Sequence, residues 1–461
     1  MALIPGMEEG AVDLKKMRIG YIGGHSPKVN ERAIDDQWTR YLGEYAELVK
    51  IPPLSFMKLF GGSIDGWKRR FPDNVMELGE GLQSLCFKYE IQTFYLNLPF
   101  VIPYVMMARN AKGIDLSMLF IAHSVATPFW LKQWLALAPF ITEKDVVLHS
   151  TASCKEALMR ISPRFELSVH APLCIDLRDA IPNTGGKDRI MLAIGRIEDV
   201  KNVDFLLNCF SRIRGQVPDA RLVIAGEYTG TKQQIEKYRG CIEEYMNRYG
   251  LHDAVEFTGA VLGEEKQKLF AESRLLVNLS TDPGETFGFN LLEAKASGLP
   301  VVCTRWNGFQ ELVAEGEDGL FVDCSWTSHM PVIDEEHAIE QCVGVLTDND
   351  LHRRLSQGAL SRVKAYDYQL IMPRIVDFAI QAKGHSFSGI EQKHVVRIAN
   401  TAIEEMQDIY LLEHLQRFGW LNETPYTVLS VPQDEPLSGW MNKVKPIIGH
   451  FAGEAPIYAQ Y

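Results

Sequence analysis

Short apolar segments alternate with amphipathic segments along the second half of the chain. The apolar runs predict strands at 190–194, 222–225, 255–258, 275–279, 301–304 and 320–322. Patterns with three- and four-residue spacing predict helices near 202–214, 231–249, 264–272, 288–297, 308–314, 334–346, 350–364 and 369–382. Strands this apolar, alternating with helices, are typical of a parallel sheet that is covered on both faces.

The first half shows the same alternation less clearly. An apolar segment at 17–22 runs into Gly23-Gly24, and a helical pattern follows over 31–46. Further strands are predicted near 91–96, 117–122 and 145–149, with helical segments between and after them. A strand, a glycine turn and a helix in this order open a doubly wound α/β domain.

These patterns predict two domains and an extension. The segment 180–187 is rich in helix and strand breakers, so we expect a first Rossmann-like domain over 17–180 and a second over 187–385. Residues 386–461 combine a long amphipathic segment, 388–418, with a tail that contains several prolines. We expect this partly helical extension to brace the two domains; a contact in a homodimer and a contact with a partner protein are the alternatives.

Composition narrows the class of protein. The chain of 461 residues is 46% hydrophobic and 23% charged, as in globular proteins, and its net charge of -12 argues against binding to nucleic acid. The cysteines are widely spaced and form no metal-binding pattern, so we expect reduced, mostly buried thiols. The first residues do not resemble a secretory signal, and we expect a cytoplasmic protein.

Two carboxylates mark the most specific stretch of the sequence, residues 282–300. Glu285 lies in a loop that contains glycine and proline, and Glu293 lies in the helix that follows. No basic residue stands beside either one in the sequence, so both suit ligand hydroxyl groups as hydrogen-bond acceptors. The alternative is an ordinary acidic residue at a helix start, followed by a solvated helix residue.

Two cations lie at an earlier crossing from strand to helix. Arg196 and Lys201 follow the strand predicted at 190–194. Arginine can grip a diphosphate with a fork of donors and lysine with a point charge; the alternative is that both are surface cations. The strand order of a doubly wound fold can bring them to the same sheet edge as Glu285 and Glu293.

Together these stretches resemble the GT-B glycosyltransferases of family 4, the retaining group. The resemblance is strong over 187–385, weaker over 17–180 and absent from 386 onward. It is carried by a set of short motifs: Gly195-Arg196, Lys201-Asn202, Glu285 and Glu293 separated by seven residues, Gly298-Leu299-Pro300-Val301-Val302, and Asn307-Gly308-Phe309-Gln310-Glu311.

The resemblance implies a role for each matching position in the second domain. Arg196 and Lys201 are expected to hold the donor diphosphate, and Glu285 to lie beside the donor sugar. Glu293 is expected on the ribose hydroxyls. The backbone amides of Phe287, Gly288 and Phe289 are expected to contact the sugar and phosphate. The turn at Val261 is expected to lie at the nucleobase.

Fewer positions match in the first domain. Gly23 and Gly24 correspond to a glycine loop near the donor phosphates, and a simple tight turn is the alternative. His123 ends the strand predicted at 117–122 and matches a histidine near the reacting carbon; a structural histidine is the alternative. His25 is a weaker candidate for contact with the acceptor.

The resemblance implies a retaining transferase that moves a sugar from a nucleotide-diphosphate donor to an acceptor hydroxyl. We expect no metal and no cofactor: two cations suit the leaving diphosphate, and the Asp348-Asn349-Asp350 stretch reads as a helix cap. A UDP-sugar is the expected donor, and the acceptor is a sugar, a lipid-linked sugar or a small molecule. The alternatives are a phosphorylase or disaccharide synthase of the same fold, and an inactive partner subunit that binds nucleotide sugar.

Overall fold

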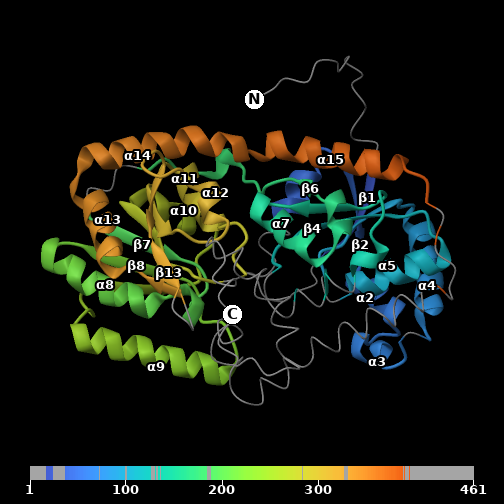
Figure 1. The fold of residues 1–461 in the computed structure, drawn as a ribbon, viewed down its shortest axis with the longest axis horizontal. Coiled ribbons are helices and arrows are strands. Elements are labelled where there is room, and N and C mark those ends of the chain that lie inside the picture. Colours follow the sequence, from blue (N-terminus) through green and yellow to red (C-terminus); the bar gives the residue numbers. More distant parts are fainter. Residues whose placement is uncertain are drawn as a thin grey trace.

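The structure is a computed structural model in which two α/β units lie side by side (Figure 1). The residues it describes are 17–23, 37–71, 73–98, 101–125, 137–183, 188–282, 284–326 and 331–387, with five single residues outside these ranges: 130, 133, 134, 389 and 394. Gly24, His25 and nearly all of the extension at 386–461 lie outside the described residues.

The first unit is built on a parallel sheet with the strand order β2-β1-β3-β4-β5-β6. Its strands are β1 Arg18–Ile22, β2 Glu47–Ile51, β3 Thr93–Tyr95, β4 Ser117–Ala122, β5 Val146–His149 and β6 Val169–His170. Its helices are α2 Pro53–Met57, α3 Ile64–Lys68, α4 Val75–Tyr89, α5 Ile102–Lys112 and α7 Ala152–Ile161. Every residue of β4 and β5 is buried, as expected for strands covered on both faces.

The second unit is built on a parallel sheet with the order β12-β11-β10-β7-β8-β9. Its strands are β7 Ile190–Ile194, β8 Arg221–Ala225, β9 Val255–Gly259, β10 Leu275–Asn278, β11 Val301–Thr304 and β12 Gly319–Val322, with a small antiparallel pair, β13 Cys324–Trp326 and β14 Pro331–Ile333. Its helices are α8 Val203–Gln216, α9 Lys232–Tyr249, α10 Gly263–Glu272, α11 Phe289–Ala296, α12 Phe309–Leu312, α13 Glu335–Thr347 and α14 Asn349–Arg362.

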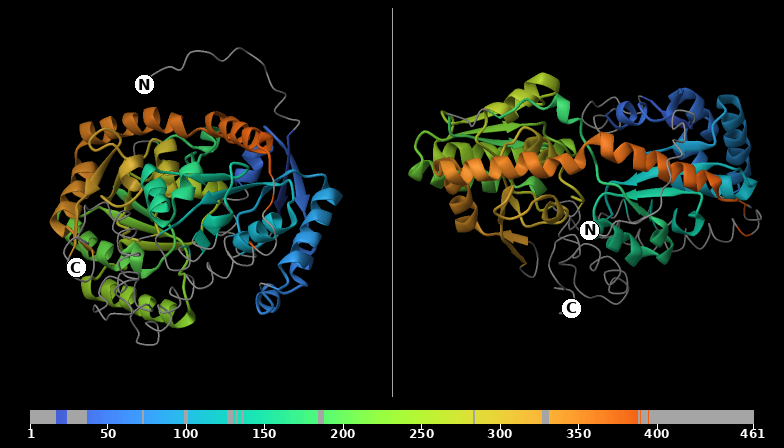
Figure 2. Two further views of the ribbon diagram at one scale, coloured as in Figure 1. Left: turned by 45° about the vertical axis from the view of Figure 1, so that its right-hand side comes forward. Right: turned by 90° about the horizontal axis from the view of Figure 1, so that it is seen from above.

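A last helix, α15 Tyr368–Gly384, ties the two units together. It follows α14 after a short turn, and the two helices run across both units in the view from above (Figure 2). α15 packs on β4 and β5 of the first sheet. The buried ammonium of Lys144 donates to the carbonyls of Lys383 at 2.9 Å and His385 at 2.7 Å, which are orphan acceptors at a helix C-terminus.

The sequence predictions agree with most elements of the second unit. The predicted cap is confirmed, because the Asp348 carboxylate accepts from the backbone N–H groups of Asp350 and Leu351 at the start of α14. All eight cysteines are free and six of them are buried, as predicted.

The first unit shows more differences. The helix predicted over 31–46 is described only from residue 37, and it ends at Leu42, where a turn at 43–46 leads into β2. The strand β2 was not predicted, because its residues Glu47–Ile51 are mostly part-exposed and show no apolar run.

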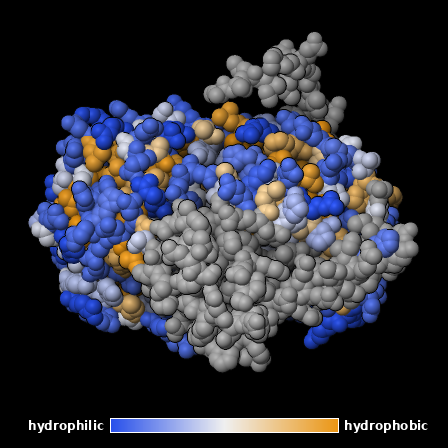
Figure 3. Space-filling model, viewed as in Figure 1, coloured by the Kyte–Doolittle hydropathy of each residue, from blue (hydrophilic) through white to orange (hydrophobic). Residues whose placement is uncertain are grey.

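The surface carries mixed chemistry. The coloured residues on the face shown in Figure 3 are mostly hydrophilic, with smaller hydrophobic areas between them. Among the described residues, no helix has both the length and the apolar character that crossing a membrane requires.

Candidate functional site

The candidate site is formed by loops at the C-terminal edge of the second sheet. Arg196 and Lys201 follow β7, and Glu285 follows β10. β7 pairs with β10 in the middle of this sheet, where the strand order reverses direction. Loops from such a switch point diverge and leave room for a ligand. The structure therefore brings the two predicted motifs together.

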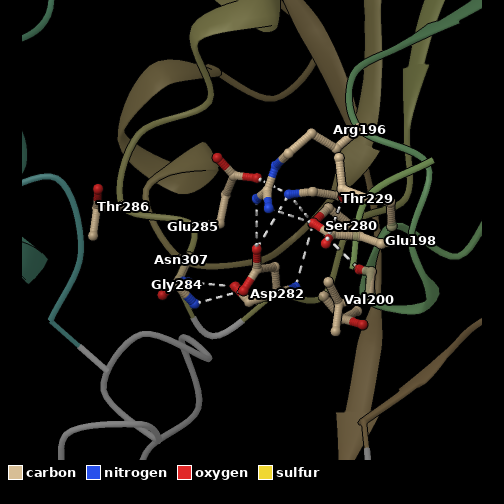
Figure 4. Close-up of polar contacts among 12 residues, drawn as sticks. Arg196, Glu198, Val200, Thr229, Ser280, Asp282, Gly284, Glu285, Thr286 and Asn307 are labelled. Carbon is tan, nitrogen blue, oxygen red and sulfur yellow. Dashed lines mark hydrogen bonds and ion pairs between the residues drawn. The ribbon is translucent and has the colours of Figure 1, made fainter. Parts of the chain in front are cut away.

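Lys201 is the centre of a charged network with Ser280, Asp282 and Glu285, three residues that are labelled in Figure 4. Its ammonium donates to Oε2 of Glu285 at 2.6 Å and to the Ser280 hydroxyl at 3.2 Å. It also lies 3.4 Å from Oδ2 of Asp282. The side chains of Lys201, Asp282 and Glu285 are 15%, 13% and 19% exposed, so this charge is concentrated in a partly enclosed space.

Arg196 approaches the same network from its solvent side. Its guanidinium lies 2.8 Å from Oε1 of Glu198 and 3.5 Å from Oδ2 of Asp282. The Arg196 side chain is 53% exposed, in contrast to Lys201. One cation is thus fixed at the floor of the site, and the other can reach a ligand with most of its donors.

Burial and charge act in opposite directions on these groups. Burial alone would lower the pKa of Lys201, but the carboxylates of Glu285 and Asp282 outweigh it and raise that pKa above its ordinary value. Burial alone would raise the pKa of Asp282, but Lys201 and Arg196 outweigh it and lower that pKa. Lys201 and Asp282 are therefore both charged at neutral pH.

Asp282 and Asn202 are site residues to which the sequence motifs assigned no role of their own. The backbone carbonyl of Asp282 accepts from the Trp306 indole at 2.9 Å, and this hydrogen bond holds the loop in place. Asn202 adopts a left-handed conformation with φ 54°, and its amide donates to the Leu279 carbonyl at 2.7 Å and the Thr281 hydroxyl at 2.9 Å. It thereby ties the Lys201 loop to the loop after β10.

The N-terminus of α11 opens beside this network. Gly288 precedes the helix with φ +98°, and a Cβ there would meet Leu291 at 2.5 Å and Phe309 at 2.6 Å. Only glycine fits such a conformation and such a close approach. The helix has no side-chain cap among the described residues, so the first-turn N–H groups at Phe289 are available to an anion. Phe287 is buried against Tyr366 and anchors the loop.

Both carboxylates have a lysine partner, which corrects the expectation that neither has a basic group beside it. Glu285 pairs with Lys201, and Glu293 pairs with Lys266 of α10 at 2.6 Å. Glu293 is also buried rather than solvated. Burial raises its pKa, and Lys266 opposes that shift without cancelling it. Val261, the predicted nucleobase position, is buried in the turn that precedes α10.

The first unit contributes His123 at the end of β4. Its Nε2 lies 2.8 Å from the side-chain amide nitrogen of Asn97, which follows β3. An amide that donates to Nε2 would place the imidazole proton on Nδ1. Gly23 directly follows β1, and a Cβ there would meet the Lys50 side chain at 2.5 Å.

The loop of Glu285 touches the first unit directly. The Thr286 hydroxyl donates to the backbone carbonyl of His123 at 2.6 Å, and the Thr286 carbonyl accepts from the Thr151 hydroxyl at 3.1 Å. The Glu311 carboxylate accepts from the first two N–H groups of α7, at 2.8 and 3.0 Å. The C-terminal edges of the two sheets thus meet at the site.

In the part of the chain that the structure describes, no group of three or more His, Cys, Asp or Glu side chains is arranged to hold a metal ion. The acidic groups of the site are instead matched by the cations Arg196, Lys201 and Lys266.

Comparisons with known proteins agree with the motifs. Residues 176–359 match the family model of the glycosyl transferases group 1. A sucrose synthase of Melioribacter roseus is 26% identical over 251 residues, 49% of this chain and 30% of that protein. A mannosylfructose-phosphate synthase of Agrobacterium fabrum is 27% identical over 190 residues, 41% of each chain. The chain thus spans less than half the length of both relatives.

Among solved structures, HepE of Anabaena in complex with UDP and glucose matches with a TM-score of 0.62 and 15% identity, over 78% of this chain and 98% of that one. At this identity the likeness shows the fold: two Rossmann-like domains in the GT-B arrangement.

Proposed function

We propose that this chain, which carries a glycosyl transferases group 1 domain on a GT-B fold, transfers a sugar from a nucleotide-diphosphate donor to an acceptor hydroxyl. One observation carries the proposal. Arg196 and Lys201 converge on Asp282 at 3.5 and 3.4 Å, beside Glu285 and at the switch point of the second sheet. That is a pair of cations where a diphosphate leaving group needs them.

The barrier to glycosyl transfer is departure of the nucleoside diphosphate while positive charge grows at the sugar carbon. Fixed cations lower this barrier, because they stabilise the charge that develops on the leaving group. Lys201 is held in place by its carboxylate partners, and Arg196 is exposed enough to turn onto the phosphates. With these two cations and the α11 N-terminus, the transfer needs no metal.

The anomeric configuration is retained in this proposal. Retention through a covalent intermediate needs a free carboxylate nucleophile near the sugar carbon. Glu285 is instead bound to Lys201 at 2.6 Å, which lowers its nucleophilicity. The acceptor hydroxyl therefore attacks from the face of the leaving diphosphate, which takes the proton. A covalent glycosyl adduct trapped on Glu285 would contradict this step.

The donor in this proposal is a UDP-sugar, supported by the UDP bound in the structural neighbour HepE. A thermal-shift screen with UDP, GDP, ADP and TDP and their sugar conjugates tests it, first with a chelator and then with magnesium. A ligand that binds only the native state raises its melting temperature. We expect a shift with a uridine nucleotide that magnesium does not change and that Arg196→Met removes. A screen without any shift would contradict the proposal.

A second candidate is a disaccharide synthase, in which the acceptor is itself a free sugar. The names of the two relatives, a sucrose synthase and a mannosylfructose-phosphate synthase, favour it. Incubation of the donor with a panel of free sugars and sugar phosphates, followed by product analysis, separates this candidate from transfer to a lipid-linked sugar.

A further inference from the structure

A partly buried ion pair lies in the second unit, apart from the network around Lys201. The Lys266 ammonium on α10 donates to Oε1 of Glu293 on α11 at 2.6 Å. The two side chains are 22% and 8% exposed. Lys266 stands in the first turn of α10, shortly after the turn that holds Val261. The ion pair therefore joins the β9–α10 turn to α11, the two segments between which a nucleoside would lie.

The pair leaves hydrogen-bonding capacity open on both sides. Lys266 contacts only one oxygen of Glu293, and no other hydrogen bond within the described residues reaches that carboxylate. An ammonium has three donors, and the contact with Glu293 is the only hydrogen bond that Lys266 makes with a described side chain. A vicinal diol can therefore accept from Lys266 and donate to Oε2 of Glu293.

A buried carboxylate needs such a partner in order to stay charged. Burial disfavours the ionised form of Glu293, and Lys266 is the one charged group in the described structure that acts against burial there. A charged acceptor binds a hydroxyl more strongly than a neutral one, and it does so in a fixed direction only if its own side chain is held.

We propose that Lys266 is a positioning residue of the donor site, which holds Glu293 as an oriented carboxylate acceptor for the ribose hydroxyls of a nucleoside diphosphate. The inference rests on the proposed function and names a determinant of donor recognition within it. The alternative is a purely structural role, in which the pair only pins α10 to α11.

The matched variants are Lys266→Met and Lys268→Met. Methionine keeps most of the apolar stem of lysine, and Lys268 lies on the same helix in an exposed pair with Glu264 at 3.2 Å. The probes are the nucleoside diphosphate that wild type binds in the thermal-shift screen and its 2′,3′-dideoxy analogue, titrated by calorimetry.

We expect Lys266→Met to weaken the ribonucleotide about tenfold, the cost of one charge-assisted hydrogen bond, and Lys268→Met to leave it unchanged. The dideoxy analogue should bind wild type and Lys266→Met equally, because it lacks the hydroxyls that Glu293 accepts from. Lys266→Arg should restore most of the affinity.

A pH series adds a readout that a structural pin would not move. Without Lys266 the pKa of Glu293 rises further, so the carboxyl is protonated at a higher pH. As the pH is lowered, ribonucleotide affinity should therefore begin to fall at a higher pH in Lys266→Met than in wild type. In Glu293→Gln the affinity should be low, its remaining pH dependence should be that of the nucleotide phosphates alone, and adding Lys266→Met should change it no further.

Each outcome separates the two proposals. Equal loss of ribonucleotide and dideoxynucleotide in Lys266→Met, or no loss of either, would overturn the inference and leave the proposed function standing. Wild type that binds no nucleoside diphosphate would overturn both. If Lys266→Met does not fold, Lys266→Gln takes its place in the same titrations, and it must lose affinity for the ribonucleotide but not for the dideoxy analogue.

Discussion

The C-terminal edges of the two sheets meet at the site, but they present different chemistry. The edge of the second sheet presents a dense set of paired charges around Lys201, Asp282 and Glu285. The edge of the first sheet presents His123, whose Nε2 lies 2.8 Å from the Asn97 amide. In the proposed function this difference corresponds to a division of work, in which the second unit holds the anionic leaving group and the first unit orients the groups around the reacting carbon.

Replacing a cation of the second edge should give the largest effect. In Lys201→Met and in Arg196→Met we expect nucleoside diphosphate affinity to fall roughly a hundredfold each, since each removes charge-assisted bonds to phosphate. Calorimetric titration measures the loss. Arg189→Met is the control, because Arg189 lies in the same unit in a partly exposed pair with Asp219. Nucleotide affinity that stays near wild type in both variants would contradict the division of work between the two sheet edges.

Replacing His123 tests the opposite edge. We expect His123→Ala to reduce turnover roughly a hundredfold, within the range for a side chain that acts on the transition state, while nucleoside diphosphate affinity stays within about twofold of wild type. Release of nucleoside diphosphate from the donor measures turnover. A fall in affinity as large as the fall in turnover would show that the two edges do not divide the work.

Thr286 joins the two edges, so its removal should uncouple them. Thr286→Val keeps the shape and removes the hydroxyl that donates to the His123 carbonyl at 2.6 Å. We expect turnover to fall about tenfold with unchanged nucleotide affinity, the size of one buried hydrogen bond. Thr286→Ser, which retains the hydroxyl, is the control and should stay near wild type; a loss as large as that of Thr286→Val would contradict the role of this bond.

Protonation of Asp282 in acid should lower the stability of the protein. Lys201 and Arg196 hold its pKa below the ordinary value, so its contribution to stability is present above about pH 4 and is lost as pH falls through the lowered pKa. Asp282→Asn lacks this contribution. Near neutral pH, denaturant unfolding should therefore give wild type a free energy of unfolding about 1 kcal/mol larger than that of Asp282→Asn. This difference should shrink toward about pH 3. A difference that does not change with pH would contradict a stabilising role of the charged Asp282 carboxylate.

The sequence predicted the second unit well because its strands are buried on both faces. Runs such as Val301–Thr304 are mostly apolar and are buried throughout, and the glycine at 288 marks the start of α11. The Arg196 and Glu285 loops were expected at one edge, and the pairing of β7 with β10 places them there. The strand β2, which is mostly part-exposed, left no comparable signal.

The partners within the site could not be predicted, because they come from distant parts of the chain. Glu285 meets Lys201 across 84 positions, and Glu293 meets Lys266 across 27. A motif shows the residues that stand next to each other in the sequence, whereas burial and pairing are set by the order of strands in the sheet. For this reason the sequence motif does not reveal a basic partner for Glu293, and the partly buried Lys266 becomes visible only in the fold.

The decisive measurement is a crystal structure of the chain with the nucleoside diphosphate selected by the thermal-shift screen. We predict phosphate oxygens within hydrogen-bonding distance of both the Arg196 guanidinium and the Lys201 ammonium, with the ribose at Glu293. A nucleotide whose phosphates lie away from both cations, or which binds elsewhere on the molecule, would contradict this site.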